Sequence, residues 1–415
     1  MIHALLGERG TTVCRGCRGT TLASVLDLGE QPLSNEMGVR SDQDLERFPL
    51  HLRICRSCGL GQVGEVVLAD RIFGDNYPYL SSTSVSWVQH ARRYAEALIG
   101  ELNLTGDHLV LEIASNDGYL LSSFRDEGVR ILGVEPARNV AAMAVQAGIP
   151  TLNEFFGVSA ARRIVAGHGH PRLVVANNVM AHVPDLEDFV GGIAALIDDS
   201  SVITVENPSL VKLLLERQFD TIYHEHFSYL TALAVRTVAR QHGLQLFRVQ
   251  ELETHGGSNR YWMRRDVGVA PEPSVEATIE AELAAGLLEE RVWAEFAEAS
   301  HAAIDGLRQW LDEQTTARAM VAGYGAAAKG NTLLNAAGAT CTDLAYVVDG
   351  SIEKQGRFLP GSGVPVHAPH HLADEQPDHV LVLPWNLAAE IVPLVADQAG
   401  DACVWVAIPE MTRLR

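Results

Sequence analysis

Four short apolar runs in the middle of the chain indicate the strands of an open parallel sheet. They span residues 110–113, 131–134, 173–176 and 202–205. The first run breaks into a small-residue turn and a helical stretch, and the others end at Glu135, Asn177 and Glu206. In a doubly wound α/β sheet the carboxyl ends of the strands carry the ligand contacts. We therefore predict an α/β domain with its site at these strand ends.

Helical spacing dominates two other parts of the chain. An amphipathic pattern from Trp87 to Leu102 leads into the first strand. Residues 274–314 are rich in Ala, Glu and Leu, and we interpret their regularly spaced apolar face as core. Between these parts, residues 255–260 (His-Gly-Gly-Ser-Asn-Arg) form a small-residue loop. A last strand, glycine turn and helix start at 319–331, with a further strand at 346–349, predict a second α/β unit.

The first strand and its turn have the features of a nucleoside-binding unit. Small residues at 114–118 let a ligand approach the backbone closely. Glu135 follows at about the 20-residue offset at which such sheets present an acid to ribose hydroxyls. Because the turn lacks a G-x-G-x-x-G pattern, a ligand without phosphate, such as S-adenosylmethionine, fits best. An ordinary strand, turn and helix with surface acids is the alternative. The expected cofactor-binding residues are Glu112, Ala114, Asn116, Asp117, Gly118, Glu135 and Asn177.

Composition sets the class of protein. The chain has 415 residues, of which 47% are apolar and 20% charged, as in a globular protein with several domains. Its 32 basic and 52 acidic side chains give a formal charge of −20, which repels nucleic acid and anionic membranes. Met1 to Thr12 shows no signal-peptide pattern, and no apolar stretch reaches roughly 18 residues. We expect a cytoplasmic protein without nucleic-acid or membrane partners; its oligomeric state stays open, with a monomer as one option.

Two C-x-x-C pairs, Cys14/Cys17 and Cys55/Cys58, predict a zinc site near the start of the chain. Four thiolates fill a tetrahedral zinc completely, so the metal would be structural and not catalytic. Residues 18–54, between the pairs, exceed the loop of a compact zinc ribbon, and we expect strands there. Two disulfides, or two separate redox pairs, are the competing interpretations.

Residues 223–227 (Tyr-His-Glu-His-Phe) place three kinds of proton-transfer side chain just beyond the nucleoside unit. This concentration indicates an active site. A metal site is excluded because His224 and His226, two apart on a helix, would face different ways, and the H-E-x-x-H pattern is absent. A strand or turn of satisfied polar residues is the alternative.

The glycine turn of the last α/β unit, around Gly325, is suited to hold a phosphate group. Backbone N–H groups at the start of a helix attract anions, and Lys329 adds a positive charge there. Lys354 offers a second basic group near the end of the next strand. A packing role for the turn is the alternative.

The order of these motifs resembles that of the sugar C-methyltransferases that act on dTDP-linked 4-keto deoxysugars in antibiotic biosynthesis. The likeness spans the paired cysteines, the E-x-x-x-N-D-G motif, the Y-H-E-H-F run, the H-G-G-S loop and the terminal G-Y-G-A-x-A-K-G unit. It implies an N-terminal zinc-binding lobe, a central Rossmann-like domain that binds S-adenosylmethionine, and a C-terminal Rossmann-like domain that holds the nucleotide sugar. We place these domains at residues 1–75, 76–265 and 266–415, the last beginning with a helical linker.

The same resemblance implies roles for individual residues. His226 would be the general base, with Tyr223 and Glu225 assisting it. The expected substrate-binding residues are Tyr77, His182, Arg260, Gly325, Lys329 and Lys354. The chain departs from the family at residues 114–115, where a glycine and a small polar residue or cysteine are expected. It also departs at His224, where relatives carry an acid as well, and we assign His224 no catalytic role.

The chemistry of a ketosugar is consistent with these roles. A 4-keto group acidifies the neighbouring C–H, so a base can form an enolate whose carbon attacks a sulfonium methyl. Histidine, with a reference pKa of about 6.5, is neutral near pH 7, whereas tyrosine suits hydrogen bonding to the oxyanion. We expect methylation of a dTDP-4-keto-deoxysugar next to the keto group, with C3 favoured over C5. The alternatives are a nicotinamide-dependent oxidoreductase on a nucleotide sugar, a methyltransferase with another acceptor, and a zinc-containing nucleic-acid module.

Overall fold

The computed structural model describes residues 12–64, 67, 69–74, 77, 80–83 and 85–415. These form two compact units, each assembled from separate stretches of chain. Unit 1 comprises Met1–Leu22, Cys55–Ser209 and Phe227–Leu288, and unit 2 comprises Ala23–Ile54, Leu210–His226 and Glu289–Arg415. The expected boundary at 75/76 and nearly all of Met1 to Thr12 lie outside the described residues, and the three-domain division stays a prediction.

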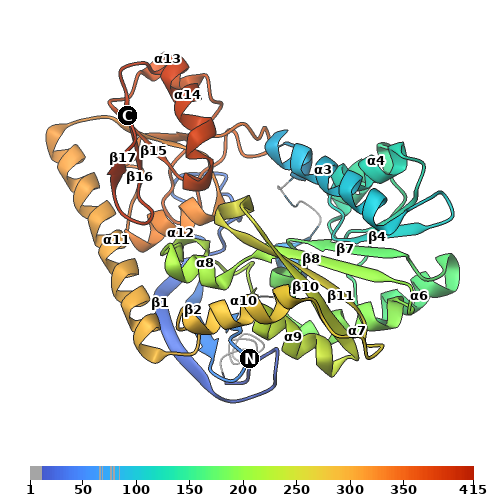
Figure 1. The fold of residues 1–415 in the computed structure, drawn as a ribbon. Helices are drawn as coiled ribbons and strands as arrows, with labels where there is room; N and C mark the ends of the chain where they lie inside the picture. Colours follow the sequence, from blue (N-terminus) through green and yellow to red (C-terminus); the bar gives the residue numbers. More distant parts are fainter. Residues whose placement is uncertain (1–11, 65–66, 68, 75–76, 78–79, 84) are drawn as a thin grey trace. The chain divides into compact units, whose positions relative to one another are not determined.

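A mixed sheet forms the centre of unit 1, and most of its strands are visible side by side in Figure 1. In spatial order the strands are β10 (Leu244–Leu252), β11 (Ser258–Arg265), β8 (Val202–Pro208), β7 (Leu173–Asn177), β4 (Leu109–Ile113), β5 (Arg130–Val134) and β6 (Thr151–Leu152). The strands from β8 to β6 pair in parallel, whereas β10 and β11 join antiparallel. All four apolar runs are therefore confirmed as strands of an α/β sheet.

Helices cover both faces of this sheet because its strands are apolar on both sides. Along β4, Val110 packs with α3 (Val85–Leu102) and α4 (Tyr119–Asp126). Its neighbour Leu111 joins the opposite cluster with α6 (Val158–His168), α7 (Leu186–Leu196) and α9 (Ala232–Gln241). Successive strand residues point to opposite faces, so an uninterrupted apolar run marks a strand buried on both sides. The predicted helix from Trp87 to Leu102 is confirmed as α3. The further helix α5 (Arg138–Gln146) follows β5.

The turn near the carboxyl end of β8 corrects one prediction. The loop expected at residues 255–260 ends at Gly257: η4 (Thr254–Gly256) closes the turn, and Ser258–Arg260 belong to β11. Asn259 pairs with Asn207 on one side and Glu251 on the other. Backbone hydrogen bonds to two neighbouring strands thus outweigh the local loop preference of small polar residues.

Unit 2 contains a second, smaller sheet. In spatial order its strands are β14 (Val366–His367), β13 (Tyr346–Val348), β12 (Val321–Tyr324), β15 (His379–Val382), β16 (Cys403–Val406) and β17 (Thr412–Arg413). All pair in parallel except β17. The helices of this part are α12 (Ala328–Ala336), α13 (His371–Glu375) and α14 (Ala388–Gln398). The second α/β unit expected from the sequence is confirmed.

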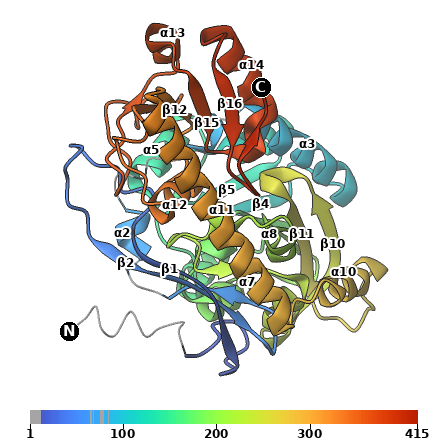
Figure 2. The ribbon, with the colours of Figure 1, turned by 90° about the vertical axis from the view of Figure 1, so that its left-hand side faces the viewer.

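Other elements complete the two units. The strands expected within residues 18–54 are confirmed as β1 (Leu22–Pro32) and β2 (Arg47–Cys55). The helical pattern of residues 274–314 forms two helices, α10 (Pro273–Ala284) in unit 1 and α11 (Glu290–Ala317) in unit 2. Gly286 between them takes a left-handed φ of +83°, which ends α10. Figure 2 shows α11 along its whole length. No helix among the described residues is both long and apolar enough to cross a bilayer.

Candidate functional site

The four paired cysteines gather in unit 1. Their Sγ atoms all lie within 4.8 Å of one another, with Cys14 3.6 Å from Cys58 and Cys17 3.5 Å from Cys55. Zinc–sulfur bonds of ~2.3 Å in a tetrahedron require sulfurs about 3.8 Å apart, whereas a disulfide requires ~2.05 Å. The donor set therefore fits a structural zinc ion, and the disulfide alternative does not fit. Such an ion would hold the two C-x-x-C segments together, and the cysteines and Leu60 belong to the same apolar cluster as residues of α9.

The turn after β4 has an unusual backbone. Ala114, Asn116 and Gly118 all have positive φ, at 57°, 50° and 82°. This conformation costs a residue with a side chain roughly 1–2 kcal/mol, and strain of this kind is kept where a ligand needs the backbone shape. It also explains why glycine is expected at 114. The turn's side chains are engaged as well, since Asn116 Oδ1 accepts from the Ser81 N–H at 2.8 Å.

Buried acceptors without partners lie at the ends of neighbouring strands. Glu112, at 1% exposure, ends β4 with an Oε2 atom that no described residue hydrogen-bonds. Asn177, at the end of β7, has a buried Oδ1 atom that also has no hydrogen-bond partner among the described residues. The same holds for Oδ1 of Asp117 in the turn. An unsatisfied buried acceptor costs ~1–3 kcal/mol. These atoms therefore fit the amino and hydroxyl donors of S-adenosylmethionine.

Ionisation in this region is shifted by burial. Burial, together with the charges of Asp117 and Glu135, raises the pKa of Glu112 well above its ordinary value. Glu135 accepts from the N–H groups of Asn116 at 3.0 Å and Ala137 at 2.8 Å, so it braces the turn. Burial raises the pKa of Glu135 although these amides lower it. Its expected contact with ribose stays a prediction.

We expect Glu112→Gln to weaken S-adenosylmethionine binding about tenfold, because one buried acceptor for the ligand becomes a donor. Thermal stability should stay the same or rise, since the variant lacks a buried acid. Isothermal titration calorimetry measures the first effect and calorimetric melting the second. Glu127→Gln, at an exposed position just after α4, is the matched control. Equal affinity in both variants would contradict the assignment.

An aromatic cluster in unit 1 brings two predicted substrate residues together. The ring of Phe73 lies 5.5 Å from Tyr77 and 5.6 Å from His182, which ends the short helix η2 (Met180–His182). The Tyr77 backbone is held by Asn139, which accepts from its N–H at 3.2 Å and donates to its carbonyl at 3.0 Å. Sequence reasoning missed Phe73, whose position after α2 (Ala69–Ile72) carries no motif.

In unit 2, Tyr223 and His226 form a hydrogen-bonded pair. The Tyr223 hydroxyl is 2.9 Å from His226 Nε2, and the Thr221 carbonyl is 3.0 Å from His226 Nδ1. A carbonyl only accepts, so Nδ1 carries the hydrogen of the neutral ring and Nε2 carries the lone pair. The Tyr223 hydroxyl donates to that lone pair. The geometry thus fixes which tautomer the neutral ring adopts and directs its basic nitrogen towards the Tyr223 hydroxyl.

Glu225 and His224 are buried beside this pair. Glu225 accepts from the backbone N–H and the side-chain amide of Asn35, each at 3.2 Å, and burial raises its pKa to about 7. His224 donates from Nε2 to the Phe48 carbonyl at 3.2 Å, and burial lowers its pKa to about 4, so it is neutral and held by packing. Asn35, 190 residues away, was missed because no local pattern links it to Glu225.

The raised pKa of Glu225 predicts a pH effect on stability. Between its ordinary pKa of about 4.5 and about 7, the folded state holds a proton that the unfolded chain has lost. Stability therefore falls as pH rises through this window. Glu225→Gln removes the cost, so its unfolding free energy relative to wild type should increase from pH 5 to pH 8. Urea unfolding at both pH values measures this, and a pH-independent difference would contradict it.

The glycine turn of unit 2 has a backbone conformation that requires glycine. Gly325 has a φ of +87°, and an added Cβ would lie 2.6 Å from Pro384, so only glycine fits. Lys354 Nζ donates to the Ala326 carbonyl at 2.8 Å and lies 3.7 Å from Asp349. Asp349 in turn accepts from the Ala326 N–H at 2.7 Å. Lys354 is therefore at the turn, where the prediction placed it.

A buried acid lies near the second predicted lysine. Lys329 donates to Asn386 at 2.8 Å and lies 4.7 Å over the Trp385 ring. The Trp385 indole donates to Asp220 at 2.8 Å. Burial raises the pKa of Asp220 to about 6, although the Lys329 charge lowers it, and burial lowers the pKa of Lys329. Asp220 and Trp385 were not predicted, because 165 residues separate them in the sequence.

The predicted substrate residue Arg260 is engaged within unit 1. At 5% exposure, its guanidinium donates to Glu206 at 2.7 Å and Gln250 at 3.3 Å, and lies 3.8 Å over the Tyr94 ring. Its contact with substrate stays a prediction.

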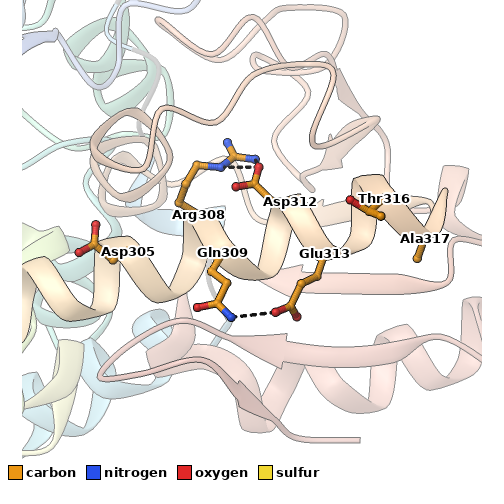
Figure 3. Close-up of a pocket in the computed structure, with 7 residues that line it drawn as sticks. All are labelled: Asp305, Arg308, Gln309, Asp312, Glu313, Thr316 and Ala317. Atoms are coloured by element: carbon orange, nitrogen blue, oxygen red, sulfur yellow. Dashed lines mark hydrogen bonds and ion pairs between the residues drawn. The ribbon is translucent and has the colours of Figure 1, made fainter.

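A hollow on the surface of unit 2 has no part in this chemistry. Figure 3 shows that it follows one stretch of α11, where Arg308 pairs with Asp312 and Gln309 with Glu313. None of the predicted site residues lines it.

Comparison with known proteins identifies the family. Family models match a zinc binding domain at residues 14–73, a methyltransferase domain at 88–249 and the C-methyltransferase C-terminal domain at 253–409. The chain is 36% identical over 388 residues to the C-methyltransferase NovU of Streptomyces niveus, covering 91% of each chain.

The solved structures that match are less similar to this chain in sequence. Magnesium protoporphyrin IX methyltransferase from Synechocystis PCC 6803 with bound SAH is 16% identical, with a TM-score of 0.36 over 47% of this chain and 92% of that one. A SAM-dependent methyltransferase from Anabaena variabilis is 12% identical, with a TM-score of 0.37 over 48% and 91%. On the relationship to NovU, with the cysteine cluster and the cofactor turn, the chain belongs to the S-adenosylmethionine-dependent C-methyltransferase family.

Proposed function

We propose that this C-methyltransferase acts on a dTDP-linked 4-keto deoxysugar. The methyl group is placed on the carbon next to the keto group, at C3 in preference to C5. The observation that carries the proposal is the Tyr223–His226 pair, in which contacts to the Thr221 carbonyl and the Tyr223 hydroxyl orient both ring nitrogens of His226. Proton removal next to a carbonyl needs a base of this kind.

In this proposal His226 removes the proton of the activated carbon through Nε2. The Tyr223 hydroxyl, released from Nε2, donates a hydrogen bond to the developing oxyanion. Glu225, whose carboxyl group is held by Asn35, is assigned to assist the pair. Bound S-adenosylmethionine supplies an electrophilic methyl group for the resulting nucleophilic carbon.

The remaining predicted residues hold the two ligands. Glu112, Asn177 and the 114–118 turn bind the methyl donor. For the acceptor, we assign the diphosphate to the Gly325 turn with Lys329 and Lys354. We assign the sugar to Tyr77, His182 and Arg260. A nucleotide sugar suits these cationic groups in a chain whose charge of −20 disfavours nucleic acid.

Incubation with S-adenosylmethionine and a panel of dTDP-4-keto deoxysugars tests the proposal. The panel should vary the substituent at C3 and include a 4-hydroxy sugar that cannot form an enolate. We expect a mass increase of one methyl group for the ketosugars only, and proton NMR locates it. Methylation of the 4-hydroxy sugar, or of no ketosugar, would refute the proposed acceptor.

A further inference from the structure

An imidazole and a carboxylate that are not among the predicted site residues form a pair in unit 1. His90 lies in the second turn of α3, and its Nε2 is 3.1 Å from Oε1 of Glu206 on β8. The Glu206 side chain is fully buried, whereas that of His90 keeps 16% of its surface exposed. A carboxylate only accepts, so Nε2 carries the hydrogen. Nδ1 is then the ring atom that can exchange a proton, and it makes no hydrogen bond to any described residue.

Glu206 is fixed in its ionised form. It also accepts from Arg260 at 2.7 Å and from the Thr254 hydroxyl at 3.2 Å. Burial acts to raise the pKa of Glu206, but the hydrogen bonds and charges of His90 and Arg260 outweigh it and lower the pKa. A buried carboxylate that orients a partly accessible imidazole and stabilises its cation is a recurring arrangement in proton-transfer sites.

Two independent contacts place this pair at the cofactor end of the sheet. Glu206 is the register partner of Asn177, the predicted cofactor residue on the neighbouring strand β7. The His90 ring stacks on Trp87 at 5.0 Å, and Trp87 lies 6.2 Å from Tyr119, the first residue after the cofactor turn. Open α/β sheets bind their ligands at this carboxyl edge.

A purely structural role for the His90–Glu206 pair explains these contacts less well than a catalytic role. Arg260 and Thr254 already satisfy the Glu206 carboxylate, and α3 is held to the sheet by apolar residues such as Leu98 and Ala95. Anchoring α3 therefore does not require a histidine at position 90.

We propose that His90, oriented by Glu206, is a further catalytic residue of this enzyme. It donates a hydrogen bond from Nδ1 to the carbonyl oxygen of the acceptor. This role rests on the proposed function, because only a carbonyl acceptor develops an oxyanion. The proton shifts from Nδ1 towards oxygen while the base breaks the C–H bond, and it returns when the carbonyl re-forms. The base keeps the C–H proton, so the step consumes no other reactant.

Charged and titratable groups among the described residues approach His90 from β8, from β11 and from its own helix. Glu206 from β8 contacts it directly, Arg260 from β11 lies behind Glu206, and Tyr94 is one turn further along α3. The Tyr94 hydroxyl is engaged with Thr204, and burial raises the pKa of Tyr94 above 10, so it stays neutral.

His90→Gln separates catalysis from anchoring. The glutamine Nε2 can still donate to Glu206, but the side chain has no second nitrogen that can be protonated. We expect an unchanged melting temperature and S-adenosylmethionine affinity, with methylation kcat and solvent-deuterium exchange of the ketosugar each reduced at least tenfold. His168→Gln, exposed at the end of α6, is the matched control and should behave as wild type. His90→Leu, which also loses the bond to Glu206, measures what the anchor contributes to stability.

The outcomes are distinguishable. A His90→Gln protein with wild-type kcat and exchange rates overturns this inference while leaving the proposed function intact. So does one that loses stability or cofactor affinity in proportion to activity, because that result assigns His90 to structure. A wild-type protein that methylates no ketosugar overturns the proposed function and this inference with it.

Discussion

His226→Ala is expected to lower kcat for methylation by ~10²–10⁴, the usual contribution of a general base. The variant should also lose the exchange of the sugar C–H with solvent deuterium that the wild type catalyses without a methyl donor. The reason is geometric: Nε2 of His226 is the lone-pair nitrogen held by Tyr223, and no such nitrogen remains after truncation. Exchange is followed by proton NMR in deuterated buffer, and methylation by mass spectrometry.

Tyr223→Phe is the variant to compare with His226→Ala. It removes one hydroxyl and leaves the imidazole, so the exchange rate should fall less than in His226→Ala. S-adenosylmethionine affinity should be the same in both variants, because neither side chain is among the predicted cofactor-binding residues. If His226→Ala kept wild-type exchange, another group would be the base and the mechanism would be wrong.

Loss of the zinc site is expected to unfold part of unit 1. Structural zinc stabilises small lobes by ~10–16 kcal/mol in peptide systems, which exceeds the total stability of most domains. Cys58→Ser, at a buried ligand, should therefore lower zinc content below one ion per chain and reduce the melting temperature by more than 10 °C, on the order expected for several kcal/mol. Metal analysis and calorimetry measure both quantities.

Cys341→Ser is the control for this experiment, since Cys341 is exposed and lies outside the cysteine cluster. Its zinc content and melting temperature should match those of wild type. A chelator should reproduce the effect of Cys58→Ser on the wild-type protein. A Cys58→Ser protein with full stability would show that the cluster does not hold a structural metal.

The local sequence pattern was sufficient to predict elements that have a distinctive run of apolar or small residues. The runs at 110–113 and 173–176 became β4 and β7 because an apolar strand of that length satisfies both faces of a covered sheet. The turn after β4 was recognisable from its small residues, although its left-handed backbone at Ala114 was not. The loop predicted from local pattern was wrong at Ser258–Arg260, where pairing with two neighbouring strands decided the conformation.

In the candidate site, too, some residues were predicted from the sequence and others were found only in the structure. Tyr223, His226 and Glu225 stand close together in sequence and were predicted. Their partners are remote: Asn35 reaches Glu225 across 190 residues. Likewise His90 reaches Glu206 across 116 residues, and of the two only Glu206, at the end of a predicted strand, carried a sequence signal. From the sequence alone, a histidine on an amphipathic helix is taken for a surface residue, because the strand that packs beside it is not known.

By itself, the sequence determined the class of fold and the cysteine set for zinc, since each depends on chemistry encoded within a few positions; its cofactor turn and its base residues stay predictions. Only the tertiary structure decided which tautomer His226 adopts, which acids are buried and which imidazole Glu206 orients. These properties depend on hydrogen-bond partners and burial, which arise when distant segments pack and cannot be read from the spacing of residues along one strand or helix.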